Sequence, residues 1–294
     1  MKKCIFMAMT ALFVCCSDQQ LTDGVTDVKS KELVQTSDDK EKFDALVEKA
    51  RWGDGQAFLQ LADCYRDGIG VKKDFLGMMY MVKQANEVGA IDKEEKYFAR
   101  LSDEDVYKRC FDIINLSNSE LRAGKDSIQT ILNAMDNPDA LAMCGIVSVE
   151  CGDTVGGFET IQMAADNGSD FASVLQTMRN SNWELRPDKN KLKQIADKIP
   201  MAYSMLGRIY SVFEKDNDTN KRLKAHYYLE AEKHALLSKW GAAWLLSYYE
   251  ENGDIQLTDE DVKRLEARFY SYNQDNEKEV VVADTMCVDS IDNQ

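Results

Sequence analysis

The chain has 294 residues, of which 51 are acidic and 36 are basic, so its formal net charge at pH 7 is −15. Binding to nucleic acid or to anionic lipid headgroups needs a basic footprint, and this acidic balance argues against both as direct ligands. Only three prolines and few runs of β-branched residues favour helix over most of the chain.

Residues 1–16 have the pattern of an export signal. Two lysines precede an apolar run, 4–14, that is too short to span a bilayer. Residues 12–16 resemble the lipobox of bacterial lipoproteins, in which the cysteine after the cleavage site is acylated. Cys15 would be the small residue before the cut, so the resemblance implies lipidation at Cys16; an ordinary cleaved signal is the alternative. We expect export and lipid anchoring at a bacterial envelope membrane, on the periplasmic or cell-surface face.

The segments that flank the expected helical region differ from it in composition. Residues 17–40 are rich in Ser, Thr, Asp, Gln and Lys without helical periodicity, which predicts a flexible tether. Residues 271–294 predict an acidic, mobile tail. The cysteines that remain after the signal and Cys16 are odd in number and lack C-x-x-C spacing, so we expect no disulfide framework, although one long-range disulfide stays possible. They are Cys64, Cys110, Cys144, Cys151 and Cys287.

Residues 41–270 carry a recurring helical stripe, with small and large apolar residues at i, i+4 and i+8. After a first amphipathic helix at 43–50, the clearest copy is followed by a glycine turn, an N-cap at Asp74 and a second helix that stops at Gly89. Pro138 suits the first turn of a later helix, and 259–272 predicts a terminal capping helix. The stripes comprise Ala57, Leu61, Tyr65, Gly68 and Gly70; Ala140, Cys144 and Ser148; Ala202, Leu206 and Tyr210; and Gly241, Leu245 and Tyr249.

Repeated helical hairpins predict an all-α solenoid, in which each unit buries its apolar edge on the next and the whole forms a long curved rod. The order A-x-x-x-L-x-x-x-Y-x-x-G-x-G resembles the Sel-one-like repeat, a relative of the tetratricopeptide repeat. The match is specific over 53–89, good over 200–253 and partial over 137–168. It is poor over 92–135 and 170–199, so the number of repeats stays open.

The resemblance implies particular packing roles. Small residues such as Ala57, Ala202 and Ala242 let neighbouring helices approach closely, while the stripe leucines and tyrosines fill the groove between them. It also implies an adaptor or scaffold that holds proteins on a concave face, and no enzymatic activity.

No constellation in the sequence predicts catalysis, a cofactor or a metal. The turn at 68–73 joins two helices, whereas a phosphate loop joins a strand to a helix. The acidic run at 216–220 lacks the glycine and glutamate that a calcium loop requires. His226 and His234 would be about 12 Å apart on one helix, too far to share a metal.

We therefore expect a non-catalytic scaffold that is anchored to a membrane by lipid and binds protein partners, but not nucleic acid. A glycan- or peptidoglycan-binding lipoprotein is the alternative. It would use the aromatic residues near the carboxyl end, most of which we expect in the core: Tyr227, Tyr228, Trp240, Trp244, Tyr248 and Tyr249.

Overall fold

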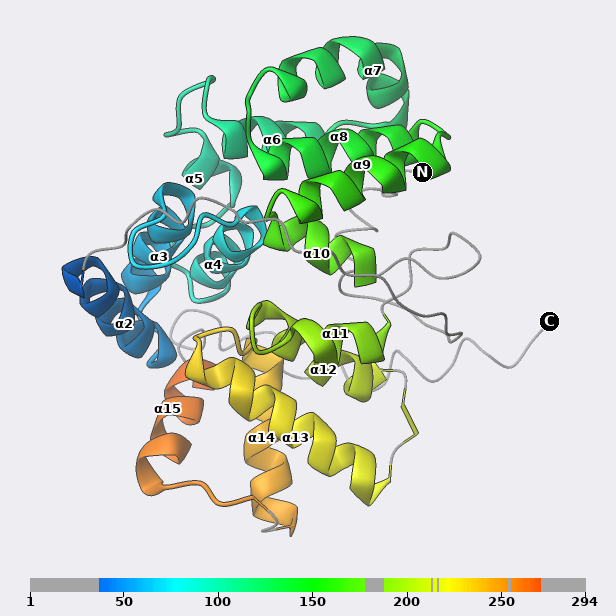
Figure 1. The fold of residues 1–294 in the computed structure, drawn as a ribbon. Helices are drawn as coiled ribbons and strands as arrows, with labels where there is room; N and C mark the ends of the chain where they lie inside the picture. Colours follow the sequence, from blue (N-terminus) through cyan, green and yellow to red (C-terminus); the bar gives the residue numbers. More distant parts are fainter. Residues whose placement is uncertain (1–36, 178–187, 213, 216, 253–254, 271–294) are drawn as a thin grey trace.

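The computed structural model describes most of the chain, and within that part it is helical without any strand (Figure 1). This confirms the all-α prediction. The expected signal with Cys16, most of the tether and the acidic tail lie outside the described residues. No helix in the described part is long and apolar enough to cross a membrane. The described ranges are 37–177, 188–212, 214–215, 217–252 and 255–270.

The described helices follow one another along the chain. They are α2 (Ser37–Arg51), α3 (Gly55–Asp67), α4 (Phe75–Glu87), α5 (Glu95–Phe98), α6 (Val106–Ile114), α7 (Asn118–Asn133), α8 (Pro138–Glu150), α9 (Thr154–Asp166), α10 (Asp170–Thr177), α11 (Lys189–Ile195), α12 (Met201–Val212), α13 (Asp218–Lys233), α14 (Lys239–Asn252) and α15 (Asp259–Tyr270).

Local signals set the helix ends in the first hairpin. Gly68 ends α3 in the left-handed conformation with φ 78°, and Gly70 has φ 68° with its Cα close against α2, where a Cβ would meet the Asp39 carbonyl. Asp74 caps α4 by accepting from the amides of Leu76 and Gly77, as predicted.

One boundary differs from the prediction. Helix α2 begins at Ser37, so the last residues of the segment expected as a tether are helical. The reason is local electrostatics: Asp38 and Asp39 in the first turn complement the helix dipole, and Lys40 pairs with Asp44 one turn later at 2.7 Å.

Hairpins form where consecutive helices pack side by side: α3 on α4, α8 on α9, α12 on α13 and α14 on α15. The middle hairpin starts as expected, with Asn137 as N-cap and Pro138 in the first turn of α8. Asn217 caps α13 by accepting from the Asn220 amide. Asn217 and Asn220 belong to the acidic run that we compared with a calcium loop, and here they begin a helix.

The α8–α9 hairpin depends on a close approach of two glycines. A Cβ on Gly145 would lie 2.6 Å from the Gly157 carbonyl oxygen, and a Cβ on Gly157 would lie 2.7 Å from that of Gly145. We expect Gly145→Ala to lower the free energy of unfolding by about 1 to 3 kcal/mol, measured by urea unfolding, because the helices must separate. The matched exchange is Gly124→Ala on α7, where the nearest atom to a new Cβ is the flexible end of Ile128 at 3.3 Å. It should instead stabilise by about 0.5 to 1 kcal/mol through helix propensity.

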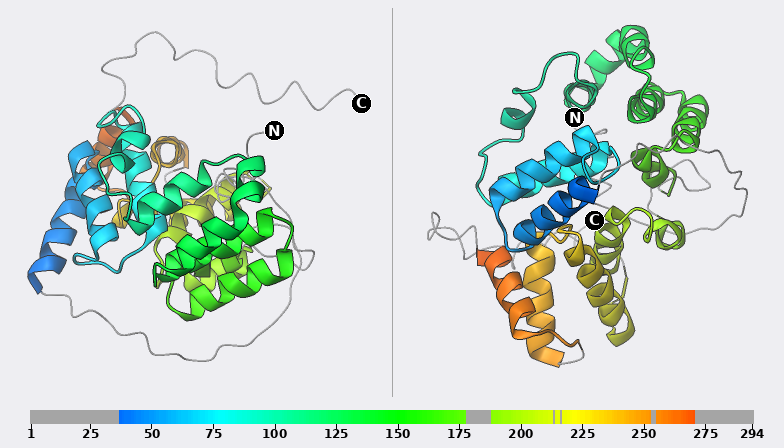
Figure 2. Two further views of the ribbon diagram at one scale, coloured as in Figure 1. Left: turned by 90° about the horizontal axis from the view of Figure 1, so that it is seen from above. Right: turned by 60° about the vertical axis from the view of Figure 1, so that its left-hand side comes forward.

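The arrangement differs from the long curved rod that we expected, because the first and last hairpins meet. Figure 1 shows α7–α9 at the top, α13–α15 at the bottom and α2–α4 between them on the left; the second view of Figure 2 agrees. The Tyr80 hydroxyl of α4 donates to the Leu236 carbonyl at 2.7 Å. Arg268 of α15 donates to the Ala50 carbonyl of α2 at 2.8 Å, across 218 residues of sequence. In an open solenoid each unit contacts only its neighbours.

The buried side chains form two clusters. The larger one runs from Phe43 in α2 to Leu236 after α13. The smaller one is built from α13, α14 and α15 around Leu245 and Leu265. The last hairpin therefore shares with α13 a core that is separate from the larger cluster, and polar contacts join it to the first hairpin.

Candidate functional site: the closure seam and its surroundings

The residues of the repeat stripe divide between the core and its edge. Tyr65 and Tyr249 are half-buried, and Tyr65 packs edge-on against Phe43 with ring centroids 5.7 Å apart. The buried stripe residues are Ala57, Leu61, Gly70, Ala140, Cys144, Ser148, Ala202, Leu206, Tyr210, Gly241 and Leu245. None of these side chains forms a pocket with chemistry of its own; they are where helices touch.

A buried arginine joins the ends of the fold. Arg268 is 4% exposed, and its guanidinium donates to the carbonyls of Ala50 and Leu237, at 2.8 and 2.6 Å, and to the Gln84 side chain. Its Cζ lies 4.4 Å from the centre of the Phe58 ring. Burial lowers the pKa of Arg268 from its ordinary value, but an arginine remains charged at any physiological pH. One side chain thus connects α2, α4, α15 and the turn before α14.

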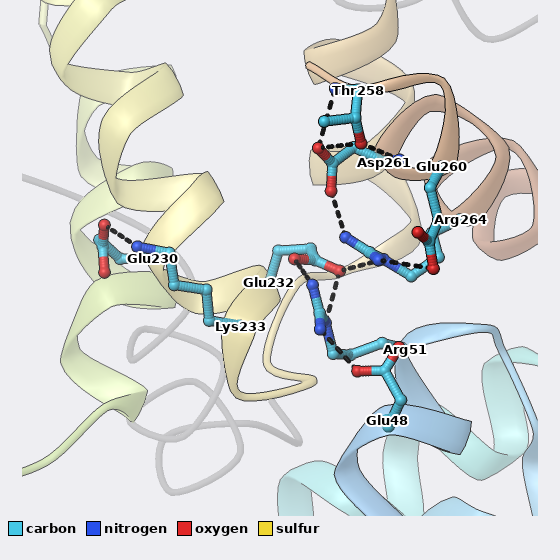
Figure 3. A network of polar contacts seen from close by, with 9 residues as sticks. All are labelled: Glu48, Arg51, Glu230, Glu232, Lys233, Thr258, Glu260, Asp261 and Arg264. Atoms are coloured by element: carbon cyan, nitrogen blue, oxygen red, sulfur yellow. Dashed lines mark hydrogen bonds and ion pairs between the residues drawn. The ribbon is translucent and has the colours of Figure 1, made fainter. Parts of the chain in front are cut away.

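Glu232 lines the same small hollow as Arg268 and joins two further arginines, Arg51 and Arg264 (Figure 3). Glu232 accepts two hydrogen bonds from Arg51, at 2.9 and 2.8 Å, and a third from Arg264 at 3.2 Å. Arg264 also pairs with Asp261, which in turn accepts from Thr258. Burial alone would lower the pKa of Arg51, but its hydrogen bond and charge interaction with Glu232 raise it. Both oxygens of Glu232 are engaged by guanidinium groups, so this carboxylate holds structure together and is not poised as a base.

We call this set of contacts the closure seam. A small hollow opens on it, lined by charged and apolar side chains from both ends of the chain. The residues of the seam are Ala50, Arg51, Gln84, Glu232, Leu237, Arg264 and Arg268, and the hollow adds Ala235 and Leu265.

Two tryptophans are exposed beside the seam: Trp52 is 40% exposed and Trp240 is 71% exposed. Arg268 donates to the carbonyls of Ala50 and Leu237. Trp52 follows Ala50 by two residues, and Trp240 follows Leu237 by three. With successive Cα atoms about 3.8 Å apart, the two tryptophans lie at most roughly 30 Å from each other. That span fits within one standard protein interface of about 800 Å² per partner.

The other carboxyl-terminal aromatics are largely covered. Tyr227, Tyr228 and Tyr248 are buried. Trp244 is half-buried: it stacks on Tyr248 at 4.9 Å, and the Lys224 ammonium lies 3.9 Å from the centre of its ring. Trp240 is therefore the aromatic of this group that is most available to a partner.

A second buried polar cluster, the acidic junction, lies where α4, α6, α8 and α10 meet. Asp139 accepts from the Phe75 amide and the Tyr107 hydroxyl, both at 3.0 Å, and from the Ser169 hydroxyl at 2.5 Å. Asp74 directly precedes Phe75 in the chain, and both Asp74 and Asp139 are buried. Paired carboxylates with raised pKa values can mark catalytic sites. Here, however, the oxygens accept backbone and hydroxyl hydrogens at a helix junction, so their role is structural.

Metal and thiol chemistry find little support in the part of the chain that the structure describes. No group of three or more His, Cys, Asp or Glu side chains there has the arrangement to hold a metal ion. His226 is exposed and His234 is half-buried, with burial lowering the pKa of His234. The described cysteines, Cys64, Cys110, Cys144 and Cys151, are free thiols.

Comparison with known proteins gives no match: no protein-family model, curated protein or solved structure is similar to this chain at the level of significance required. The resemblance to the Sel-one-like repeat thus stays a prediction. What the fold itself defines is an all-helical protein whose first and last hairpins are joined by a buried arginine.

Proposed function

We propose that this chain is a non-catalytic helical-repeat protein, a scaffold or assembly adaptor that binds protein partners at a bacterial envelope membrane. Lipidation at Cys16 would anchor it there, and stacked hairpins of the Sel-one-like type, curled until the first meets the last, would present the binding surface. The pairing of α3 with α4, α8 with α9 and α12 with α13 supports this arrangement.

The observation that carries the proposal is the exposure of Trp240 beside a rigid seam. Tryptophan is enriched among the few residues that dominate protein interfaces, whereas a large apolar side chain in water gains nothing for the monomer. Hydrogen bonds from Tyr80 to Leu236 and from Arg268 to Leu237 hold the turn that leads into α14, so the backbone before Trp240 is fixed and little entropy is lost on binding.

Trp240→Ala tests the proposal. Partners recovered with the tagged protein from cross-linked native membranes should fall about tenfold or more, since truncating an interface tryptophan commonly costs about 2 kcal/mol or more of binding energy. Thermal unfolding should barely change, because the side chain is mostly in water. Met163→Ala on α9, 51% exposed and far from the seam in sequence, is the matched control and should leave recovery unchanged. Equal recovery with Trp240→Ala and Met163→Ala would contradict the proposal.

The same exposed indole also suits a sugar ring, so glycan or peptidoglycan binding remains the second candidate. It predicts that the wild type co-sediments with purified cell wall and that Trp240→Ala does not. If Trp240→Ala loses co-sedimentation with cell wall but recovers as many protein partners as the wild type, this second function is favoured over the first.

A further inference from the structure

A lysine-rich stretch stands out on this acidic chain. Residues 188–198 contain four lysines and two aspartates, and they span α11 and the turn that leads to α12. Helix α11 packs on α12, and α12 packs on α13. Lys189 and Lys193, one helical turn apart, lie against the Tyr210 ring of α12, and Lys191 and Lys198 stand on the same short segment.

A row of tyrosines lies beneath Lys193. The rings of Tyr203 and Tyr227 are stacked with centroids 6.5 Å apart, and those of Tyr210 and Tyr227 are 5.6 Å apart. The Lys193 ammonium lies 5.5 Å from the centre of the Tyr210 ring and 5.9 Å from that of Tyr227. It donates to the Tyr210 hydroxyl at 3.0 Å. Aromatic faces hold the cation in place electrostatically without neutralising it.

The carboxylates of this region are already engaged. Asp188 caps α11 by accepting from the amides of Asn190 and Lys191, and Asp197 accepts from the Tyr203 hydroxyl at 2.5 Å. Glu214 pairs with Lys189, also at 2.5 Å. Among the described residues no carboxylate pairs with Lys191, Lys193 or Lys198 within ion-pair distance.

Lys193 keeps its charge although it lies on aromatic rings. Its pKa is raised, chiefly by the hydrogen bond to Tyr210, against the opposing effect of burial. The hydroxyls of Tyr210 and Tyr227 engage two of its three N–H groups, and the third remains available for an incoming acceptor. Lys193 and Lys198 are exposed and Lys191 is half-exposed.

We propose that this lysine–tyrosine face, made of Lys191, Lys193, Lys198, Tyr203, Tyr210 and Tyr227, binds an acidic segment of a partner polypeptide. Spaced carboxylates would pair with the three lysines, and the segment would pack against the exposed part of the tyrosine row. A dense polyanion is a poorer occupant, because the net charge of −15 repels a long charged polymer, whereas a short segment contacts the basic face alone. The inference adds a second surface to the proposed scaffold and does not involve Trp240.

Direct binding tests this face with a defined probe, a short fluorescent peptide of alternating glutamate and serine, titrated with the full-length protein and followed by anisotropy. We expect saturable binding that weakens as salt is raised and vanishes when glutamine replaces glutamate. Changing Lys191, Lys193 and Lys198 together to Gln should raise Kd about tenfold. The matched triple changes Lys42, Lys49 and Lys263 to Gln, removes the same charge from exposed positions elsewhere, and should change Kd by less than about twofold.

The Tyr210→Phe variant distinguishes the positioning of the Lys193 ammonium from the net charge of the face. It keeps the ring and the net charge and removes only a hydroxyl that holds Lys193, so Kd should rise about threefold with the salt dependence nearly unchanged. Absence of peptide binding, or equal weakening by both lysine triples, would overturn the inference. So would binding to vesicles containing phosphatidylglycerol without binding to the peptide, which would indicate a membrane surface instead. Unchanged partner capture by Trp240→Ala bears only on the scaffold proposal and not on this face.

Discussion

Arg268→Met is expected to lower the free energy of unfolding by about 3 to 5 kcal/mol, the largest loss we expect from a single change on the seam. Methionine preserves much of the length and apolar contact of the side chain but donates nothing. The carbonyls of Ala50 and Leu237 and the amide oxygen of Gln84 then lose their charged donor while still buried. An unsatisfied buried acceptor costs about 1 to 3 kcal/mol, and three are affected together.

The measurement is urea unfolding of the full chain, with small-angle scattering of the folded state as a second readout. Because α14 and α15 share with α13 a core that is separate from the larger cluster, weakening the seam should let α14 and α15 separate from α2 and raise the radius of gyration before the helices melt.

Arg100→Met supplies the control for this prediction. Arg100 also covers an aromatic ring, with its Cζ 4.1 Å from the Tyr97 centroid, and it also binds an acceptor, Asp63 at 3.0 Å. Its side chain is 45% exposed, so water replaces what is lost and the expected effect is below about 1 kcal/mol. Comparable losses for Arg100→Met and Arg268→Met would show that burial and closure are not what make Arg268 matter.

The features that sequence reasoning predicted well are those set by neighbouring residues. Gly68, Gly70, Asp74 and Pro138 act within one or two turns of their own position, and the structure gives each the backbone role that local chemistry requires. The all-helical class follows from the same kind of information, since apolar spacing is read over a single helix.

The seam was beyond such reasoning. Arg268 and Ala50 are separated by 218 residues, and Arg51 and Glu232 by 181. A charged residue within a helix rich in Asp and Glu has the pattern of a solvated face, and nothing in its spacing indicates which distant carbonyl it will meet. A long curved rod was the natural expectation because a repeat of the predicted kind describes how neighbouring hairpins stack, whereas closure depends on how much each step turns.

The candidate binding residues show a similar limit. Six aromatics were grouped near the carboxyl end, but the sequence did not predict that Lys224 would cover Trp244 while Trp240 stays 71% exposed. The lysine–tyrosine face was missed because its aromatic row comes from two helices and its lysines from a third. Clustered lysines in 188–198 within an acidic chain were the available signal.

The acidic junction should make stability depend on pH. Burial first, and then the charges of Asp139 and Asp170, raise the pKa of Asp74 from 3.8 to about 8. Burial also raises the pKa of Asp139, but hydrogen bonds from Ser169, the Phe75 amide and Tyr107 oppose this effect. Since Asp139 accepts three hydrogen bonds, we place the negative charge on Asp139 and the proton on Asp74 at neutral pH.

The sign follows from proton binding in the two states. The unfolded chain releases the Asp74 proton near pH 3.8, whereas the folded chain keeps it until about pH 8. Between these values the folded state binds more protons, so the contribution of Asp74 to stability is fully present below pH 3.8 and is lost as pH rises toward 8. The slope has an upper limit of about 1.4 kcal/mol per pH unit for one proton.

Asp74→Asn removes this titration and keeps the cap, because asparagine is as good an N-cap as aspartate. We expect its free energy of unfolding, relative to the wild type, to rise by about 1 kcal/mol per pH unit between pH 5 and 7, so that the variant is the more stable protein at neutral pH. Urea unfolding at several pH values measures this difference directly. Asp54→Asn makes the same exchange at the exposed cap of α3, whose carboxylate accepts from the amides of Gln56 and Ala57. Because this cap is exposed, the exchange there measures the change of cap chemistry alone. If the Asp74→Asn curve runs parallel to the wild type, the proton is not on Asp74, and the two buried carboxyl groups must share their charge in another way.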